Sequence, residues 1–169
     1  MVALLPRLRR FSYGLTGSIA DGDDLVQSAC VRALDRIGQW QPGTRLDSWM
    51  YRIVQNLWID QLRAGRSREV TMEDETMAAM PGGDQAREME AKLSLADVRR
   101  EVGRLPAEQR SVLLLVSVEG VSYKQAAEIL DIPIGTVMSR LARARLALGR
   151  ALGAEGEGVA VPAGAARAR

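Results

Sequence analysis

The chain has 169 residues and a net charge of only +2, with 47% hydrophobic and 26% charged residues. This length is enough for one ordinary domain or two small ones, and the hydrophobic share supports a packed core and excludes global disorder. With no histidine and the single cysteine Cys30, the sequence excludes His-based triads, metal sites built on imidazole or on a cysteine cluster, and an internal disulfide.

Residues 1–66 are predicted to form the first of two small helical domains in an all-α fold. Aromatic residues make up only 4% of the chain, and an apolar content supplied by Leu, Ala, Val and Met favours helices over sheets. After an amphipathic start at residues 6–15, Asp21 or Asp23 can cap a second helix. On that helix Val31 is apolar amid exposed polar residues, which is typical of a partner surface but also of a chance exposed valine.

A longer helix at residues 49–63 follows the turn signal Pro42-Gly43 and is expected to begin after a cap at Asp47 or Ser48. It is apolar over most of its circumference, so we expect it to be largely buried. Its narrow polar strip consists of Arg52, Asn56 and Arg63. The strip is either a working surface or a plain solvated face, and periodicity alone leaves both interpretations open.

A change of composition at residues 67–92 predicts a flexible linker between the two domains. Residues 69–92 carry seven acidic and two basic residues and include Pro81-Gly82-Gly83. The Ala- and Gly-rich residues 153–169 show no pattern and are predicted to form a disordered tail. Both flanking blocks carry more basic than acidic residues, which suggests two surfaces that meet a polyanion.

The second domain, residues 93–152, carries the pattern of a helix-turn-helix. Ser122 stands three residues before Gln125, which forms a capping box at the start of one helix. Asp131 is suited to end that helix in the left-handed region, and Pro133 fits the first position of the next. Two short helices joined by so tight a break usually place the second helix in the DNA major groove.

The second helix of this motif has an apolar side and a basic side. Apolar residues gather on one side at Val137, Leu141, Ala144 and Leu148, and the opposite side carries Thr136, Ser139, Arg140 and Arg143. No acidic residue occurs from 134 to 152. Because arginine reads guanine edges and binds phosphates, this side is a candidate DNA surface. A solvated basic face near a helix C-terminus is the alternative.

Several sequence runs resemble bacterial RNA polymerase sigma factors. DDLVQ at 23–27 and SWMYRIVQNLWIDQLR at 48–63 resemble conserved region 2. LPAEQRSVLLL at 105–115, EGVSYKQAAEIL at 119–130 and IPIGTVMSRLARAR at 132–145 resemble region 4. Both blocks in this order, with a short linker between them, are similar to the extracytoplasmic-function (ECF) group, which keeps only these two regions.

The resemblance implies a role for each block. The first would bind the clamp helices of the polymerase largest subunit, and its expected contact residues are Asp24, Gln27 and Val31. It would also open the promoter element nearest the start site and hold a flipped base, with expected contacts from Arg45, Asp47, Ser48, Arg52, Asn56 and Arg63. The second would read the upstream element, with expected contacts from Thr136, Ser139, Arg140 and Arg143.

The implied function is promoter-specific initiation in a stress or envelope response, with core RNA polymerase, promoter DNA and an anti-sigma factor as partners. No cofactor, metal, small-molecule substrate, enzymatic activity or membrane insertion is expected. The expected location is the cytoplasm, where an anti-sigma partner could hold the chain at the membrane. Two alternatives remain open: an ordinary helix-turn-helix regulator with an unrelated N-terminal domain, and a sigma-like decoy that binds an anti-sigma factor and no DNA.

Overall fold

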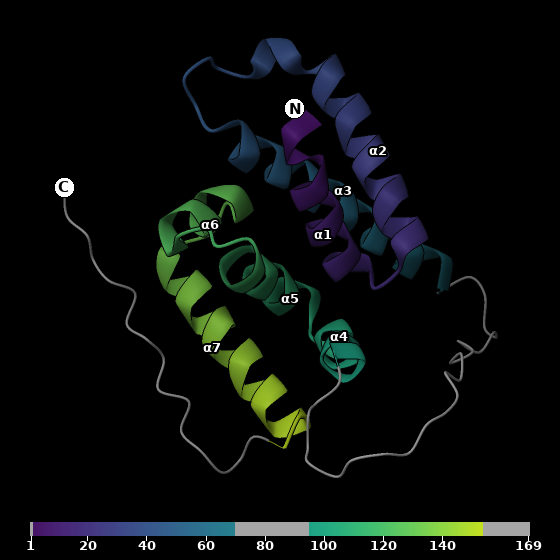
Figure 1. Cartoon of the computed structure of the whole chain (residues 1–169), viewed down its shortest axis with the longest axis vertical. Coiled ribbons are helices and arrows are strands. Elements are labelled where there is room, and N and C mark those ends of the chain that lie inside the picture. The colour runs from purple at the N-terminus through teal and green to yellow at the C-terminus, as the bar shows by residue number, and fades with distance from the viewer. Residues whose placement is uncertain (1, 70–94, 154–169) are drawn as a thin grey trace.

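The computed structural model describes residues 2–69 and 95–153, and these residues form helices and no β-strand (Figure 1). The predicted all-α fold is therefore confirmed. Of the predicted linker at residues 67–92, the first three residues continue the helix α3 (Leu46–Glu69), and the rest lies outside the described residues, as does the predicted tail beyond Gly153. We call residues 2–69 the N-terminal half and residues 95–153 the C-terminal half.

The N-terminal half is built from three helices that pack against one another. Its elements are η1 (Val2–Leu4), α1 (Leu5–Thr16), α2 (Ile19–Asp35), η2 (Ile37–Gln39) and α3. Gly17 reverses the chain between α1 and α2 with a φ of 76°, a conformation that glycine adopts without steric cost. Gly22 allows the two helices to approach closely, because a Cβ atom there would lie 3.0 Å from the backbone N of Tyr13.

Two predicted helix starts in this half are wrong. Ser18, and neither Asp21 nor Asp23, caps α2: its Oγ accepts a hydrogen bond from the Asp21 N–H at 3.3 Å, and its backbone has the extended conformation of an N-cap. The third helix begins at Leu46 and not at residue 49, so Asp47 and Ser48 lie inside its first turn.

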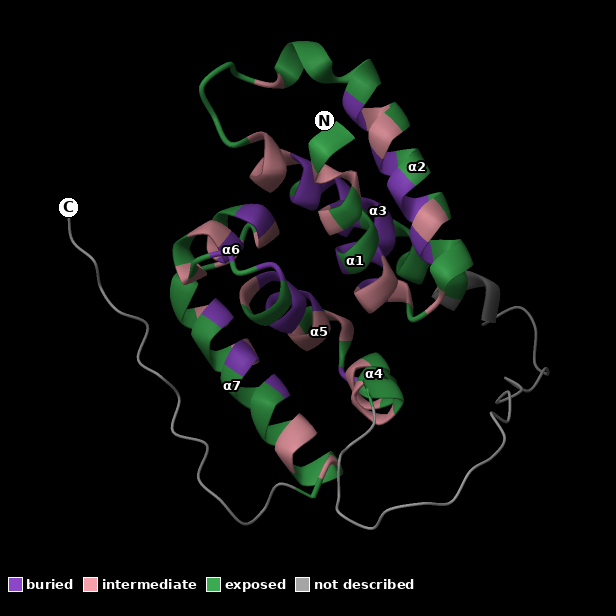
Figure 2. Ribbon diagram, in the orientation of Figure 1, coloured by how far each residue is buried: buried purple, intermediate pink, exposed green. Residues whose placement is uncertain are grey.

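The burial of α3 is as the sequence predicts. Tyr51, Val54 and Trp58 are nearly inaccessible to solvent, although they lie on different sides of the helix. By contrast, the predicted polar strip at Arg52, Asn56 and Arg63 is exposed. Figure 2 shows the same division along α1, α2 and the C-terminal helix α7 (Ile134–Ala151), with buried residues on the sides that face the neighbouring elements.

The C-terminal half contains the predicted helix-turn-helix. Its elements are α4 (Leu95–Arg104), α5 (Ala107–Leu113), the π-helix η3 (Leu114–Val118), α6 (Tyr123–Leu130) and α7 (Ile134–Ala151). The capping box of Ser122 and Gln125 is present at the start of α6, and Asp131 ends that helix with a φ of 53°. Pro133 lies one residue earlier than predicted, because it is the N-cap of α7 and not its first helical residue.

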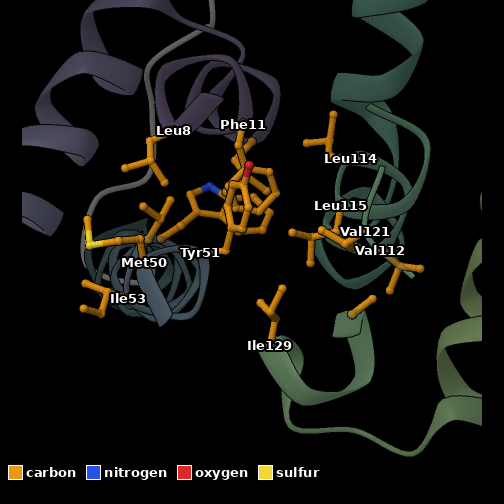
Figure 3. Close-up of a cluster of buried hydrophobic side chains, with 14 of the residues drawn as sticks. Leu8, Phe11, Met50, Tyr51, Ile53, Val112, Leu114, Leu115, Val121 and Ile129 are labelled. Atoms are coloured by element: carbon orange, nitrogen blue, oxygen red, sulfur yellow. The ribbon is translucent and has the colours of Figure 1, made fainter. Parts of the chain in front are cut away.

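The two halves share one hydrophobic core. Figure 3 shows side chains from both halves that point toward one another, with Phe11 and Tyr51 on one side and Leu115, Val121 and Ile129 on the other. The rings of Phe11 and Tyr51 meet edge to face, with centroids 5.2 Å apart. This arrangement brings α6 against α3 and the π-helix against α1, so the candidate sites of the two halves lie close to their shared boundary.

Candidate nucleic-acid and polymerase interface

The predicted recognition helix α7 has the two sides that the sequence indicates. Val137, Leu141 and Ala144 are buried against the rest of the C-terminal half. Ser139 and Arg143 are exposed, and the Arg143 Nε donates to the Ser139 carbonyl oxygen at 3.3 Å. An exposed arginine held along the helix surface is sterically free to contact a base edge or a phosphate.

Arg140 differs from the other predicted upstream-element residues. Its side chain is only 22% exposed, and its Nη2 lies 2.6 Å from the Glu108 Oε2 on α5. Thr136 is also half-buried, whereas Ser139 and Arg143 are exposed. The structure therefore brings Arg140 to the boundary between the halves and pairs it with an acidic group, and it does not leave this side chain on the open face of α7.

A polar cavity of about 560 Å³ at this boundary contains predicted residues from both halves. Its lining includes Asn56 and Arg63 from the α3 strip and Arg140 from α7, together with Arg32 and Arg36 of α2. Candidate DNA contacts from the two halves thus face one another across a shared space. A DNA duplex is too wide for a cavity of this size.

Arg52, the third residue of the α3 strip, is engaged by the C-terminal half. Its Nη2 donates to the backbone carbonyl oxygen of Glu128 in α6. A second cavity, of about 340 Å³, lies beside it. Its lining includes Arg45 and Ser48, which are two of the expected base contacts, their neighbours Thr44 and Trp49, and Glu128 and Ile129 of α6. Helix α6 therefore borders this region, although Thr44, Arg45 and Arg52 remain exposed.

Arg45 and Asp47 form a tight pair at the start of α3. The Arg45 Nε and Nη2 donate to the two carboxylate oxygens of Asp47 at 3.0 and 2.6 Å. This hydrogen-bonded guanidinium, helped by the backbone N–H of Ser48, holds the pKa of Asp47 below its usual value. Asp47 therefore stays charged and orients Arg45.

The predicted polymerase-binding residues lie together on the outer face of α2. Asp24, Gln27 and Val31 are exposed, and Val31 is 60% accessible. A shallow groove of about 580 Å³ runs past Gln27 and Val31 toward Leu57 of α3. No described residue of the C-terminal half lines this groove, so the face is open to a partner.

Sequence reasoning missed a charged cluster beneath the boundary. The carboxylate of Glu119 has no exposed surface, and it accepts hydrogen bonds from Arg10 and Tyr51 of the other half. Arg7 also contacts it, with its Nε 3.4 Å from Oε2. The available signal was one acidic residue in an otherwise uncharged and mostly apolar run from 112 to 121, because a buried charge requires a partner.

No helix within residues 2–69 and 95–153 is long and apolar enough to cross a membrane. Nor do the described residues contain a group of three or more His, Cys, Asp or Glu side chains that could hold a metal ion.

Comparisons with known proteins cover both halves. A sigma-70 region 2 family model matches residues 1–68, and a sigma-70 region 4 model matches residues 95–148. The ECF RNA polymerase sigma factor EcfG of Rhodopseudomonas palustris (strain TIE-1) is 37% identical over 92% of this chain and 84% of its own length. The ECF sigma factor SigW of Bacillus subtilis (strain 168) is 30% identical over 86% of this chain and 83% of its own length.

A solved structure has the same arrangement of helices. The sigma factor RpoE from Bartonella quintana, in a crystal structure of its complex with the anti-sigma factor NepR, is 31% identical to this chain. It aligns with a TM-score of 0.73 and covers 90% of this chain and 93% of its own.

Proposed function

The chain belongs to the extracytoplasmic-function group of RNA polymerase sigma factors, and on that basis we propose how its residues divide promoter recognition. A protein of this group directs promoter-specific initiation by core RNA polymerase. We assign residues 1–66 to polymerase binding and to the promoter element nearest the start site, residues 93–152 to the upstream element, and residues 67–92 to a linker. The observation that supports the assignment of the upstream element is the exposed side of α7 at Ser139 and Arg143, in a helix-turn-helix whose first helix begins with a complete capping box.

Run-off transcription with purified core polymerase tests this function. Addition of the protein should produce specific transcripts from its own promoters, whereas the free protein should show no tight promoter-specific binding at physiological salt. The reason is that two small DNA-reading surfaces act together only when a scaffold fixes their spacing. Tight specific binding without polymerase would support an ordinary helix-turn-helix regulator. Binding to an anti-sigma factor, with no transcription when the free protein is added to core polymerase, would support a decoy.

The upstream assignment predicts a base-specific effect of Arg143. If its guanidinium reads a guanine edge, Arg143→Ala should cost about 1–3 kcal/mol of discrimination at one upstream position. Arg145→Ala is the matched control, because Arg145 is an exposed arginine on a different side of the same helix. Run-off transcription on a library randomised in the upstream element measures both. An equal loss of transcription at every upstream sequence would show that Arg143 contacts only phosphates.

The proximal assignment predicts a melting defect for Asn56. Its amide is suited to hydrogen-bond a base edge, and unstacking a base costs a few kcal/mol that such contacts offset. Asn56→Ala should keep polymerase binding, reduce open-complex formation on duplex promoters, and recover on a template mismatched around the start site. Gln61→Ala, on another side of α3, should behave as wild type on both templates. Full activity of Asn56→Ala on duplex DNA would refute the assignment.

Regulation by an anti-sigma factor is also proposed. The exposed α2 face at Asp24, Gln27 and Val31 must be free for polymerase, and a partner that covers it would exclude polymerase. The similarity to RpoE from Bartonella quintana, which was solved with NepR, supports this proposal. Affinity purification from unstressed cells should recover a small stoichiometric partner; recovery with polymerase alone would favour control by abundance.

We place the chain in the cytoplasm with the polymerase, and propose no catalytic role.

A further inference from the structure

The exposed surface of α7 near its N-terminus is largely apolar. Five of residues 134–142 are exposed, and Ser139 is the only one of these with a polar side chain. The two large side chains among them are Ile134, which is 49% accessible, and Met138, which is 53% accessible. In a helix-turn-helix, the N-terminal residues of the second helix contact base edges in the major groove. The part of α7 that would meet base edges therefore presents apolar groups.

The polar side chains of the same turns are already engaged within the protein. Arg140 is only 22% exposed, and its Nη2 lies 2.6 Å from the Glu108 Oε2. The Ser139 Oγ donates to a backbone carbonyl oxygen of its own helix at 3.1 Å, and it accepts a bond from the Arg143 Nη2 at 3.4 Å. Arg143 is therefore the first charged side chain of α7 on its exposed side, and the turn before it is left to Met138.

Met138 is better placed than Ile134 for contact with a base. Ile134 lines a groove of about 630 Å³ together with Glu128 and Asp131, and both of these acidic residues are exposed. DNA phosphates would be repelled from this groove, because they carry the same sign of charge. Met138 is not part of the groove lining, so it can approach DNA without bringing these carboxylates close to phosphates.

Met138 also stands next to the side chains that we assign to the upstream element. Residues four positions apart lie one above the other on a helix surface. Ser139 and Arg143 form one such row, and Met138 and Ala142 form the adjacent row, displaced by one residue. A duplex whose base edge is contacted by Arg143 would therefore place a neighbouring base pair opposite Met138.

Thymine is the base that an apolar side chain can recognise in the major groove. Its 5-methyl group is the apolar group that base edges present there, whereas the other groups are hydrogen-bond donors or acceptors. An apolar side chain set against the polar edge of guanine or cytosine would remove water from that edge and leave it without a partner. A methionine side chain is unbranched and flexible, so it can adapt its shape to the thymine methyl group.

We propose that Met138 is a specificity-determining residue, which reads a thymine of the upstream element through van der Waals contact with the 5-methyl group. The upstream element of this chain then contains an A·T pair beside the position that Arg143 contacts. The inference rests on the proposed function, because it requires that α7 lie in the major groove of the upstream element. Met138 adds a base preference that neither Ser139 nor Arg143 supplies.

Templates that differ by one methyl group test this contact. Run-off transcription by the full chain with core polymerase, on a library randomised in the upstream element, locates the thymine that wild type prefers and Met138→Ala does not. Replacement of that thymine by deoxyuridine removes the methyl group and leaves the base pairing unchanged. At limiting protein, transcription by wild type should fall about fourfold, the factor that burial of one such group implies. Met138→Ala should transcribe both templates equally, because the contact is already lost.

Two further variants separate this contact from a general effect on α7. Met138→Leu keeps an apolar side chain of similar size, so it should still respond to the methyl group. Leu146→Ala removes another exposed apolar side chain, 56% accessible, about 12 Å further along the helix. This control should respond to deoxyuridine as wild type does. Far-UV circular dichroism checks that each variant is folded, as expected for changes at exposed positions.

The outcomes separate this inference from the proposed function. Equal transcription of the thymine and deoxyuridine templates by wild type would overturn the role of Met138. So would a library without a thymine preference that depends on Met138, or an equal loss in wild type and Met138→Ala on removal of the methyl group. In each of these cases promoter-specific transcription would still support the proposed function. No promoter-specific transcription from any member of the library would refute both.

Discussion

Replacement of Phe11 by alanine is expected to lower the free energy of unfolding by about 3–5 kcal/mol. Phe11 has no exposed surface and lies in the core that both halves share. The change would remove the edge-to-face contact with Tyr51 and leave a cavity between α1 and α3, which the packed surroundings cannot fill. Urea denaturation followed by circular dichroism measures the loss.

Ile19→Ala is the matched control for Phe11→Ala. Ile19 is also apolar and helical, but it is 72% exposed, and a change at such a position usually alters stability by no more than about 0.5 kcal/mol. A loss below about 1 kcal/mol for Phe11→Ala would mean that this ring is not a central part of the core.

The second large effect is expected from Leu141→Ala in α7. Leu141 is 2% exposed in the C-terminal half, and removal of a buried leucine side chain costs about 2–5 kcal/mol. The tryptophans of this chain, Trp40, Trp49 and Trp58, all lie in the N-terminal half. Their fluorescence therefore reports unfolding of that half and the loss of its contact with Arg110, whose guanidinium lies 5.6 Å from the Trp58 ring centroid, whereas circular dichroism reports helices of both halves.

Because the halves share a core and the Glu119 cluster, we expect Leu141→Ala to lower the urea concentration at the midpoint of unfolding. The midpoint measured by fluorescence should fall together with the midpoint measured by circular dichroism. Leu146→Ala, at a position 56% exposed on the same helix, should leave both midpoints in place. A fluorescence midpoint that does not move with Leu141→Ala would show that the halves unfold independently. Glu119→Gln weakens the charged cluster between the halves, so in this variant the two midpoints should separate.

Features set by neighbouring residues were predictable from the sequence. The capping box at Ser122, the left-handed Asp131 and the buried side of α7 follow from spacing and backbone preference within a few residues. The cap of α2 was missed because three nearby aspartates carry the same preference as Ser18. What decides the cap is the backbone reversal at Gly17, which leaves Ser18 in the extended conformation.

The arrangement of the candidate site was not predictable, because it depends on pairs that are distant in the sequence. Glu119 is separated from Arg10 by 109 positions, and Arg140 is turned from the recognition face by Glu108 on another helix. Helical periodicity assigns a residue to a side of its own helix, but it does not show which other helix covers that side. For this reason the α3 strip was identified correctly as polar and exposed, while the hydrogen bond of Arg52 to α6 was not anticipated.

The π-helix η3 limits the number of residues that this part of the chain can contain. Its backbone N–H to C=O bond from Glu119 to Leu114 encloses one residue more than an α-helical turn does. Deletion of a single residue between 114 and 118 would let an ordinary α-helix continue, and would rotate everything after it by about 100° about the helix axis. The carboxylate would then point away from Arg10, although every side chain of the cluster were still present. Insertions and deletions here, more than substitutions, are therefore the changes by which related chains could lose or gain the coupling between their halves.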